Sequence, residues 1–237
     1  MMEQKRITLF AGHYGSGKTN IAVNYAMYMA RQGKRVAIAD LDIVNPYFRT
    51  KDSAQELAEA GIDLISPQFA NSNVDLPALP AEAYRLVEDK QLWSVMDIGG
   101  DDRGAYALGR YTPAILQENN YQMAFVANCY RPLTRTPEEA LEVMREIEAA
   151  CHLPFTCIIN NSNLAHETTA QSVLDSMAYM EELSRLSGLP IWLTTAEESV
   201  AAELAGKVEN VLPMQLQKKY FDLPEQQRAS APRPLFG

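Results

Sequence analysis

The segment at residues 12–19 constrains the fold of this chain more than any other. It reads Gly-His-Tyr-Gly-Ser-Gly-Lys-Thr and matches the pattern G-x-x-x-x-G-K-[ST]. Residues 6–11 before it favour a short buried strand, and residues 18–32 after it carry apolar side chains at helical spacing. A strand, a glycine-rich turn and a helix in this order predict a βα unit with a functional turn.

The residue types of this turn suit an anion. Its glycines let the backbone bend and approach a ligand closely, so that backbone N–H groups and the helix N-terminus point inward. Lys18 would then reach the β- and γ-phosphates of a nucleotide, and the Thr19 hydroxyl would bind Mg²⁺. The alternative is a glycine turn that only packs a helix on a strand. The predicted nucleotide-binding residues here are Gly12, His13, Gly15, Ser16, Gly17, Lys18, Thr19 and Asn20.

Strand and helix patterns alternate along the rest of the chain, which predicts a doubly wound, mostly parallel α/β sheet with helices on both faces. We expect one nucleotide-binding domain over residues 1–222 and a mobile tail over residues 223–237. Expected strands after the first are residues 36–39, 62–65, 92–98, 123–127, 155–159 and 191–193. Expected helices after the first are residues 53–60, 81–89, a broken helix over 105–118 that is interrupted at Pro113, one from 136 onward, 167–186 and 198–205.

Two strand ends carry carboxylates. Strand 36–39 is followed by Asp40-Leu41-Asp42, and strand 92–98 ends on Asp97 with Gly100 three residues later. Ligands bind at the carboxyl ends of parallel strands, so these residues should meet the phosphate loop. Asp97 would hold Mg²⁺ through water, Gly100 would offer its N–H to a γ-phosphate, and Asp42 would bind the metal shell or orient the attacking water. Asp40 is equally well explained as an ordinary strand-end carboxylate.

With these three motifs, the chain resembles the MinD/ParA-type ATPases of the CobQ/CobB/MinD/ParA nucleotide-binding class, over about residues 5–205. The wider class includes signal-recognition GTPases and the nitrogenase iron protein. The resemblance implies a P-loop NTPase fold, ATP hydrolysis and a nucleotide-sandwich homodimer. It implies Lys18, Asp42 and Asp97 as the catalytic residues and Thr19, Asp42 and Asp97 as the Mg²⁺ ligands.

One position departs from that family. A second lysine usually follows the first glycine of the loop and reaches the partner's nucleotide, whereas this chain has His13. A largely neutral imidazole does not supply the same fixed charge at pH 7, which predicts slow basal hydrolysis and a weak or partner-dependent dimer. Arg49, Arg103 and Arg131 are alternative trans-acting cations, although each is also explained as a solvated surface arginine.

The base is predicted from the end of strand 155–159. Guanine-binding proteins use Asn-Lys-x-Asp, whereas this chain has Asn160-Asn161-Ser162-Asn163, which lacks the anionic acceptor. Similar proteins place an asparagine at the Asn160 position against adenine, so the sequence favours ATP. The alternative role of Asn160 is to cap a turn.

Charge, cysteine content and the C-terminal sequence argue against several classes of binding partner. A net charge of −9 argues against a free-standing nucleic-acid binder. Three cysteines without a C-x-x-C pair fit a reducing compartment, and no leader or membrane-spanning run is present, so we expect a cytoplasmic protein. Residues 214–221 are too short for a basic amphipathic membrane helix. A protein partner therefore remains by default.

The sequence favours a Mg-ATP-driven switch whose loops order on nucleotide binding. A small-molecule kinase or ATP-dependent ligase of related fold, similar to cobyrinate or dethiobiotin synthetases, is the alternative. In that case residues 69–80 and 130–136 would shape the substrate pocket. A bacterial tyrosine kinase fits less well, because Val44 stands where those enzymes have an arginine and the tail has only Tyr220.

Overall fold

The computed structural model describes residues 4–41, 53–65, 81–99 and 102–216, without the side chains of residues 81 and 102–105. Its centre is one sheet of eight strands in the order β3-β2-β4-β1-β5-β6-β7-β8. Every neighbouring pair is parallel. The strands are β1 (Ile7–Ala11), β2 (Val36–Leu41), β3 (Asp63–Ile65), β4 (Trp93–Ile98), β5 (Tyr121–Ala127), β6 (Cys157–Asn160), β7 (Ile191–Glu197) and β8 (Val211–Met214).

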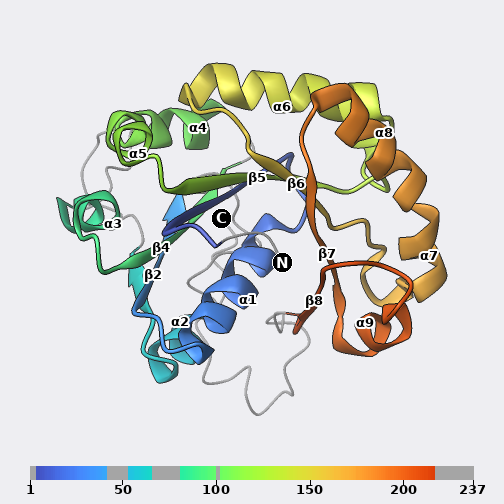
Figure 1. Cartoon of the computed structure of the whole chain (residues 1–237), viewed down its shortest axis with the longest axis horizontal. Helices are drawn as coiled ribbons and strands as arrows, with labels where there is room; N and C mark the ends of the chain where they lie inside the picture. Colours follow the sequence, from blue (N-terminus) through green and yellow to red (C-terminus); the bar gives the residue numbers. More distant parts are fainter. Residues whose placement is uncertain (1–3, 42–52, 66–80, 100–101, 217–237) are drawn as a thin grey trace, which may run out of the picture.

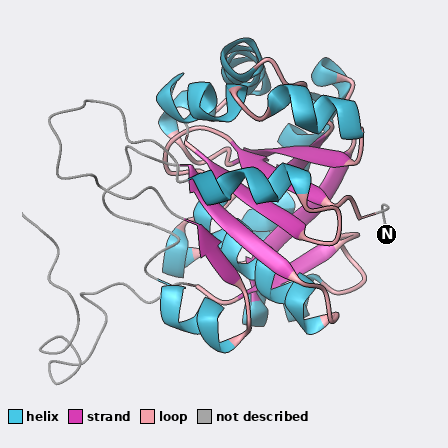
Figure 2. Ribbon diagram, turned by 90° about the vertical axis from the view of Figure 1, so that its left-hand side faces the viewer, coloured by secondary structure: helices cyan, strands magenta, loops and turns pink. Residues whose placement is uncertain are grey.

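Helices cover both faces of this sheet, as Figures 1 and 2 show. One core joins the sheet to α3, α5, α6 and α8, and a second core joins the opposite face to α1 and α2. The helices are α1 (Lys18–Arg31), α2 (Ala54–Glu59), α3 (Arg85–Glu88), α4 (Asp102–Gly109), α5 (Thr112–Glu118), α6 (Pro137–Cys151), α7 (Ala170–Asp175), α8 (Met177–Ser187) and α9 (Glu198–Leu204). The predicted doubly wound α/β class is therefore confirmed.

Strand β1 is the point at which the order of the sheet reverses. It pairs with β4 on one side and β5 on the other, and all five of its residues are buried. Burial on both faces explains its apolar composition. In such sheets the ligand site lies outside the carboxyl ends of the strands at this switch point. The loop that follows Ala11 is therefore in the position expected of a binding site.

The structure differs from the sequence prediction at one helix and at one additional strand. The helix predicted over residues 167–186 is two helices, α7 and α8. They meet at Ser176, whose hydroxyl donates to the Val173 carbonyl at 2.6 Å. Strand β8 was not predicted, since Pro213 lies within it. Proline is tolerated there because β8 is an edge strand, whose outer N–H groups pair with no neighbour in the described sheet.

Two composition-based expectations concern the cysteines and the membrane. Cys129, Cys151 and Cys157 are all free thiols, and burial raises the pKa of Cys157 to about 11. None of the helices in the described part of the chain is both long and apolar enough to cross a bilayer.

A buried ion pair ties the start of β1 to the helices beside it. Arg6 binds the Glu118 carboxylate, and its guanidinium also donates to the carbonyls of Leu86 and Leu92 at 3.1 and 2.8 Å. The Arg6 and Glu118 side chains are only 5% and 11% exposed. The hydrogen bond from Arg6 is the largest cause that lowers the pKa of Glu118.

We expect Glu118→Ala to lower the free energy of unfolding by about 2–3 kcal/mol, because it leaves Arg6 buried without its counter-ion. The pKa of Glu118 is lowered in the folded state, so its contribution is complete above the unfolded pKa and is lost as the pH falls through the folded pKa. Urea unfolding at neutral and acidic pH should show the wild-type advantage shrinking in acid. Glu182→Ala, which breaks the exposed Arg185–Glu182 pair, is the control and should change little. Equal effects of the two variants would contradict the prediction.

Candidate functional site

The loop between β1 and α1 turns through two left-handed glycines. Gly15 has φ +76° and Gly17 has φ +89°, a region that side-chain-bearing residues rarely adopt. Gly17 is the N-cap of α1, and the first turn of the helix contains no acidic residue. No carboxylate of the first turn therefore competes for the N-terminal N–H groups of α1, which suits a ligand that brings its own negative charge.

Two glycines of this loop are also required by close packing. A Cβ on Gly12 would lie 2.6 Å from the carbonyl oxygen of Val126 in β5. A Cβ on Gly17 would lie 2.2 Å from Nδ2 of Asn161. Both distances are far below van der Waals contact, so these positions accept only glycine unless the neighbours move. The loop is thus fitted against the ends of β5 and β6.

Asn161 holds the loop from the end of β6. Its Nδ2 donates to the Ser16 carbonyl at 2.5 Å, and its Oδ1 accepts from the Thr195 hydroxyl at 2.6 Å. Its backbone N–H donates to the carbonyl of Ala127 at 2.9 Å. One buried amide therefore joins the loop to β5, β6 and β7. The sequence interpretation missed this residue; its only signal was that Asn161 is the first residue after a strand.

Asn160, the predicted base contact, has a different environment. Its side chain is fully buried, with Nδ2 donating to the Ser176 hydroxyl at 2.9 Å and Oδ1 accepting from the Ser162 N–H at 3.0 Å. The second bond forms an Asx turn after β6. The structure therefore shows Asn160 in the alternative role, closing a turn, and points its amide into the protein.

The polar side chains of the loop are buried beside the helix start. Ser16, Lys18 and Thr19 are each less than 5% exposed. The Ser16 hydroxyl is buried and has no hydrogen-bond partner among the described residues. Buried polar atoms are normally satisfied, so an acceptor that arrives with a ligand fits this position. Asn20 lies in the first turn of α1 and is half-buried.

Two buried carboxylates lie side by side near the loop. Asp40 in β2 is in register with Asp97 in β4, and Asp97 is also in register with Phe10 in β1. Ile38 and Val95, two residues before Asp40 and Asp97, pack in the hydrophobic core that contains α1. Side chains two positions apart in a strand point to the same face, so both carboxylates face α1. Neighbouring carboxylates in a buried site suit a cation. The predicted residues Asp42 and Gly100 lie outside the described residues.

The side chains of His13 and Arg131 both lie at the loop. His13 is half-buried, and its Nδ1 lies 3.0 Å from the carbonyl oxygen of Tyr14. The Arg131 side chain packs against Gly15 within the same chain. Arg49 lies outside the described residues, and the side chain of Arg103 is not described. Of the predicted cations, the structure thus brings Arg131 to the phosphate loop.

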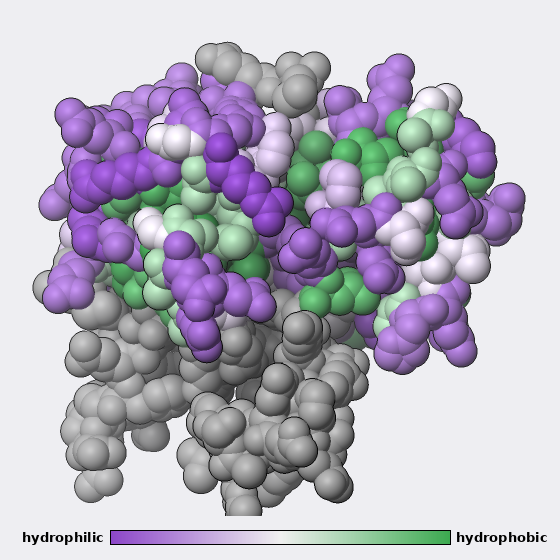
Figure 3. Space-filling view, turned by 90° about the horizontal axis from the view of Figure 1, so that it is seen from below, coloured by the Kyte–Doolittle hydropathy of each residue, from purple (hydrophilic) through white to green (hydrophobic). Residues whose placement is uncertain are grey.

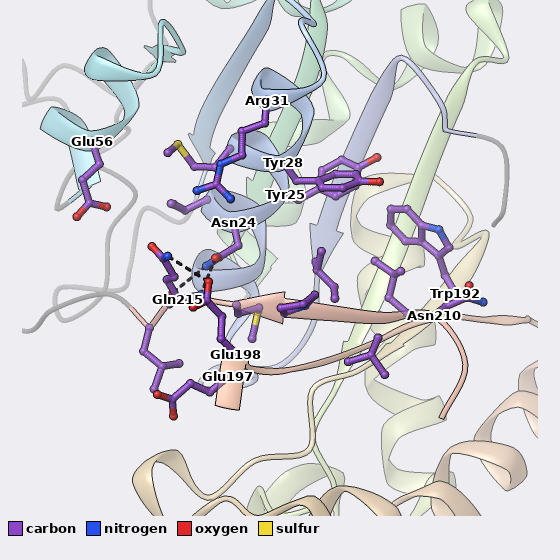
Figure 4. Close-up of a pocket in the computed structure, with 18 of the residues that line it drawn as sticks. Asn24, Tyr25, Tyr28, Arg31, Glu56, Trp192, Glu197, Glu198, Asn210 and Gln215 are labelled. Atoms are coloured by element: carbon purple, nitrogen blue, oxygen red, sulfur yellow. Dashed lines mark hydrogen bonds between the residues drawn. The ribbon is translucent and has the colours of Figure 1, made fainter. Parts of the chain in front are cut away.

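A cavity of about 790 Å³ lies between α1 and the strands β7 and β8, on the other side of α1 from β2 and β4. Figure 3 views the molecule from the side that carries α1 and α9, where apolar side chains show between hydrophilic ones. Tyr25, Tyr28 and Trp192 form an aromatic wall of the cavity, and Glu197 and Glu198 lie toward its other end (Figure 4).

A hydrogen-bonded chain connects α1 to the end of β8 at this cavity. Asn24 Nδ2 donates to the carbonyl of Gln215 at 2.9 Å, and the Gln215 N–H donates to Asn24 Oδ1 at 2.9 Å (Figure 4). Gln215 Nε2 donates to Glu198 at 3.1 Å. The Asn24 amide also donates to the Asn20 carbonyl at 2.8 Å. The cavity thus adjoins the helix of the phosphate loop, but Asp40 and Asp97 lie on the β2–β4 side of that helix.

A parallel doubly wound sheet, with a glycine loop at its switch point and buried carboxylates on the adjoining strands, defines a P-loop NTPase fold. The sequence profile of the CobQ/CobB/MinD/ParA nucleotide-binding domain matches residues 7–188, and the chain belongs to this family. A comparison with curated proteins found no match.

Solved structures support the fold. FtsY from Mycoplasma mycoides is 18% identical with a TM-score of 0.51, covering 81% of this chain and 60% of FtsY. The cell division protein FtsY from Thermotoga maritima is 16% identical with a TM-score of 0.53, covering 83% and 64%. FtsY from Elizabethkingia anophelis in complex with GDP is 14% identical with a TM-score of 0.50, covering 82% and 58%. This chain thus spans about 60% of the length of these proteins.

Proposed function

We propose that the chain is a Mg-ATP-binding ATPase that acts as a nucleotide-dependent switch on a protein partner. The observation that carries this proposal is the tethered glycine cradle at residues 12–19, with Asp40 and Asp97 buried side by side on the same face as α1. A phosphate-sized anion fits the cradle, and a cation fits the carboxylates.

The residues have separate roles in this proposal. Bound Mg-ATP supplies the phosphoanhydride bond and the metal charge that polarises it. The loop N–H groups and Lys18 bind phosphate oxygens, and Thr19 and Asp97 hold the metal and its water shell. Asp42 orients the attacking water. Asp40, in register with Asp97, would add negative charge near a metal held by Asp97.

We propose adenine over guanine for a reason that differs from the one given by the sequence. Asn161, not Asn160, holds the loop. We therefore align the asparagine of the guanine-binding pattern Asn-Lys-x-Asp with Asn161 and look for its aspartate three residues later. The residue three positions later is Leu164, whose aliphatic side chain is 42% exposed and offers no acceptor to guanine N–H groups. The GDP seen in one FtsY structure belongs to a protein only 14% identical, and it does not decide the base here.

The small-molecule kinase or ligase remains the alternative function. It requires an acceptor pocket on the side of the transferred phosphate. The cavity lies against β7 and β8, whereas Asp40 and Asp97, which mark the metal side, lie on β2 and β4. This cavity therefore does not supply the acceptor pocket that a kinase or ligase requires. Of the two predicted pocket segments, residues 130–136 do not line this cavity, and residues 69–80 lie outside the described residues.

Nucleotide binding is tested by calorimetry with ATP and GTP in the presence and absence of Mg²⁺. We expect Mg-dependent binding that is tighter for ATP. Lys18→Ala should weaken it by about 100-fold, because phosphate charge in a partly desolvated site loses its counter-ion. Lys34→Ala, at a residue beyond the end of α1, is the control. Equal affinity of Lys18→Ala and wild type would refute the phosphate site, and tighter binding of GTP would reverse the base assignment.

A further inference from the structure

Arg131 approaches the phosphate loop from the connection between β5 and α6. Its Nε, Cζ and Cδ atoms lie 3.7, 3.8 and 3.9 Å from the position of a Cβ on Gly15, which is ordinary van der Waals contact. Its backbone is fixed, because its N–H donates to the Asn128 carbonyl and its carbonyl accepts from the Thr134 N–H, both at 3.1 Å. The side chain therefore extends from a well-defined turn onto the loop.

The Arg131 guanidinium lacks a counter-ion within the described residues. In that part of the chain its buried Nε has no hydrogen-bond partner, and no ion pair involves this side chain. Arg6 shows the contrast, because its buried guanidinium is neutralised by Glu118 and bonded to carbonyls. A partly buried cation without an acceptor is unfavourable unless an acceptor arrives from elsewhere.

We propose that Arg131 binds a phosphate oxygen of the nucleotide held by its own chain. This inference rests on the proposed nucleotide-binding function and adds a cation that no motif identifies. The guanidinium is forked and permanently charged and so matches phosphate geometry, which the single imidazole ring of His13 does not. Arg131 thus compensates in cis for the charge that the second lysine supplies in the proteins this chain resembles.

The test compares Arg131→Ala with Arg135→Ala, an exposed arginine on the same connection. Calorimetry with ATP, and with tripolyphosphate competing against ATP, separates a phosphate contact from effects on the base or sugar. We expect Arg131→Ala to lose about 10- to 100-fold in affinity for both ligands, Arg131→Lys to lose less, and Arg135→Ala to match wild type. Without nucleotide, Arg131→Ala should unfold at the wild-type temperature, because the side chain has no ionic partner to lose among the described residues.

Several outcomes would overturn this inference while leaving the proposed function intact. One is wild-type ATP affinity in Arg131→Ala. Another is a lower affinity of Arg131→Ala for ATP with an unchanged affinity for tripolyphosphate. A third is a fall in the melting temperature of Arg131→Ala that is large enough to explain its lower affinity. Recovery of hydrolysis on mixing Arg131→Ala with Lys18→Ala would assign the arginine to the neighbouring subunit's nucleotide. Absence of ATP binding by the wild-type protein would instead refute the proposed function itself.

Discussion

Gly17→Ala should abolish detectable nucleotide binding. An alanine at position 17 is unfavourable for two reasons. Its backbone would be strained at φ +89°, and its Cβ would lie 2.2 Å from Nδ2 of Asn161. The amide must move, which breaks its 2.5 Å bond to the Ser16 carbonyl. The loop then loses the tether that aligns its N–H groups with the start of α1. We expect at least about 100-fold weaker ATP binding, since several charge-assisted hydrogen bonds depend on this alignment.

Gly33→Ala is a matched control for this variant. Gly33 follows the end of the same helix with φ +77°, but no described atom lies within 4 Å of the position that a Cβ would take there. The Gly33→Ala substitution therefore imposes the same backbone strain as Gly17→Ala, about 1–2 kcal/mol, without the steric clash. Thermal unfolding should show similar or moderately larger destabilisation for Gly17→Ala, while ATP calorimetry should separate the two variants. Near-wild-type ATP affinity in Gly17→Ala would show that the loop tolerates displacement of Asn161.

Asp42→Ala should separate hydrolysis from binding. If Asp42 acts on water and on the metal shell, ATP affinity should stay within about tenfold of wild type while turnover falls by about 100-fold or more. Phosphate release under saturating ATP, together with calorimetry, measures both quantities. Asp63→Ala, at an exposed carboxylate in β3, controls for a general change in charge. An equal loss of affinity and turnover would mean that Asp42 mainly holds the metal.

The same variant distinguishes the two candidate functions. A switch whose hydrolysis is blocked should remain in its ATP state and retain a protein partner in a nucleotide-dependent pull-down. A kinase or ligase should instead consume ATP only with a small acid or amine, and Asp42→Ala should not trap any partner. Weak ATP-induced dimers that strengthen with His13→Lys would support the proposed consequence of the missing lysine, and light scattering measures them.

The sequence by itself determined the fold class and the position of the main site. The glycine spacing and Lys18–Thr19 predicted a strand, a loop and a helix, and alternating apolar segments predicted a parallel sheet. These inferences hold because they depend on local chemistry: left-handed glycines, helix periodicity and the burial of parallel strands. Asp97 was likewise placed at a strand end by the apolar run before it.

Tertiary structure alone decided which side chains meet at that site. The sequence cannot distinguish Asn160 from Asn161, because one residue of register decides which amide turns into the protein and which reaches Ser16. Arg131 is 116 positions from Gly15, and only the pairing of β1 with β5 brings their loops together. Contacts between distant segments follow from strand order, which no local pattern encodes. The Asn161 tether, and the position of Arg131 against the loop of its own chain, therefore emerged only from the tertiary structure.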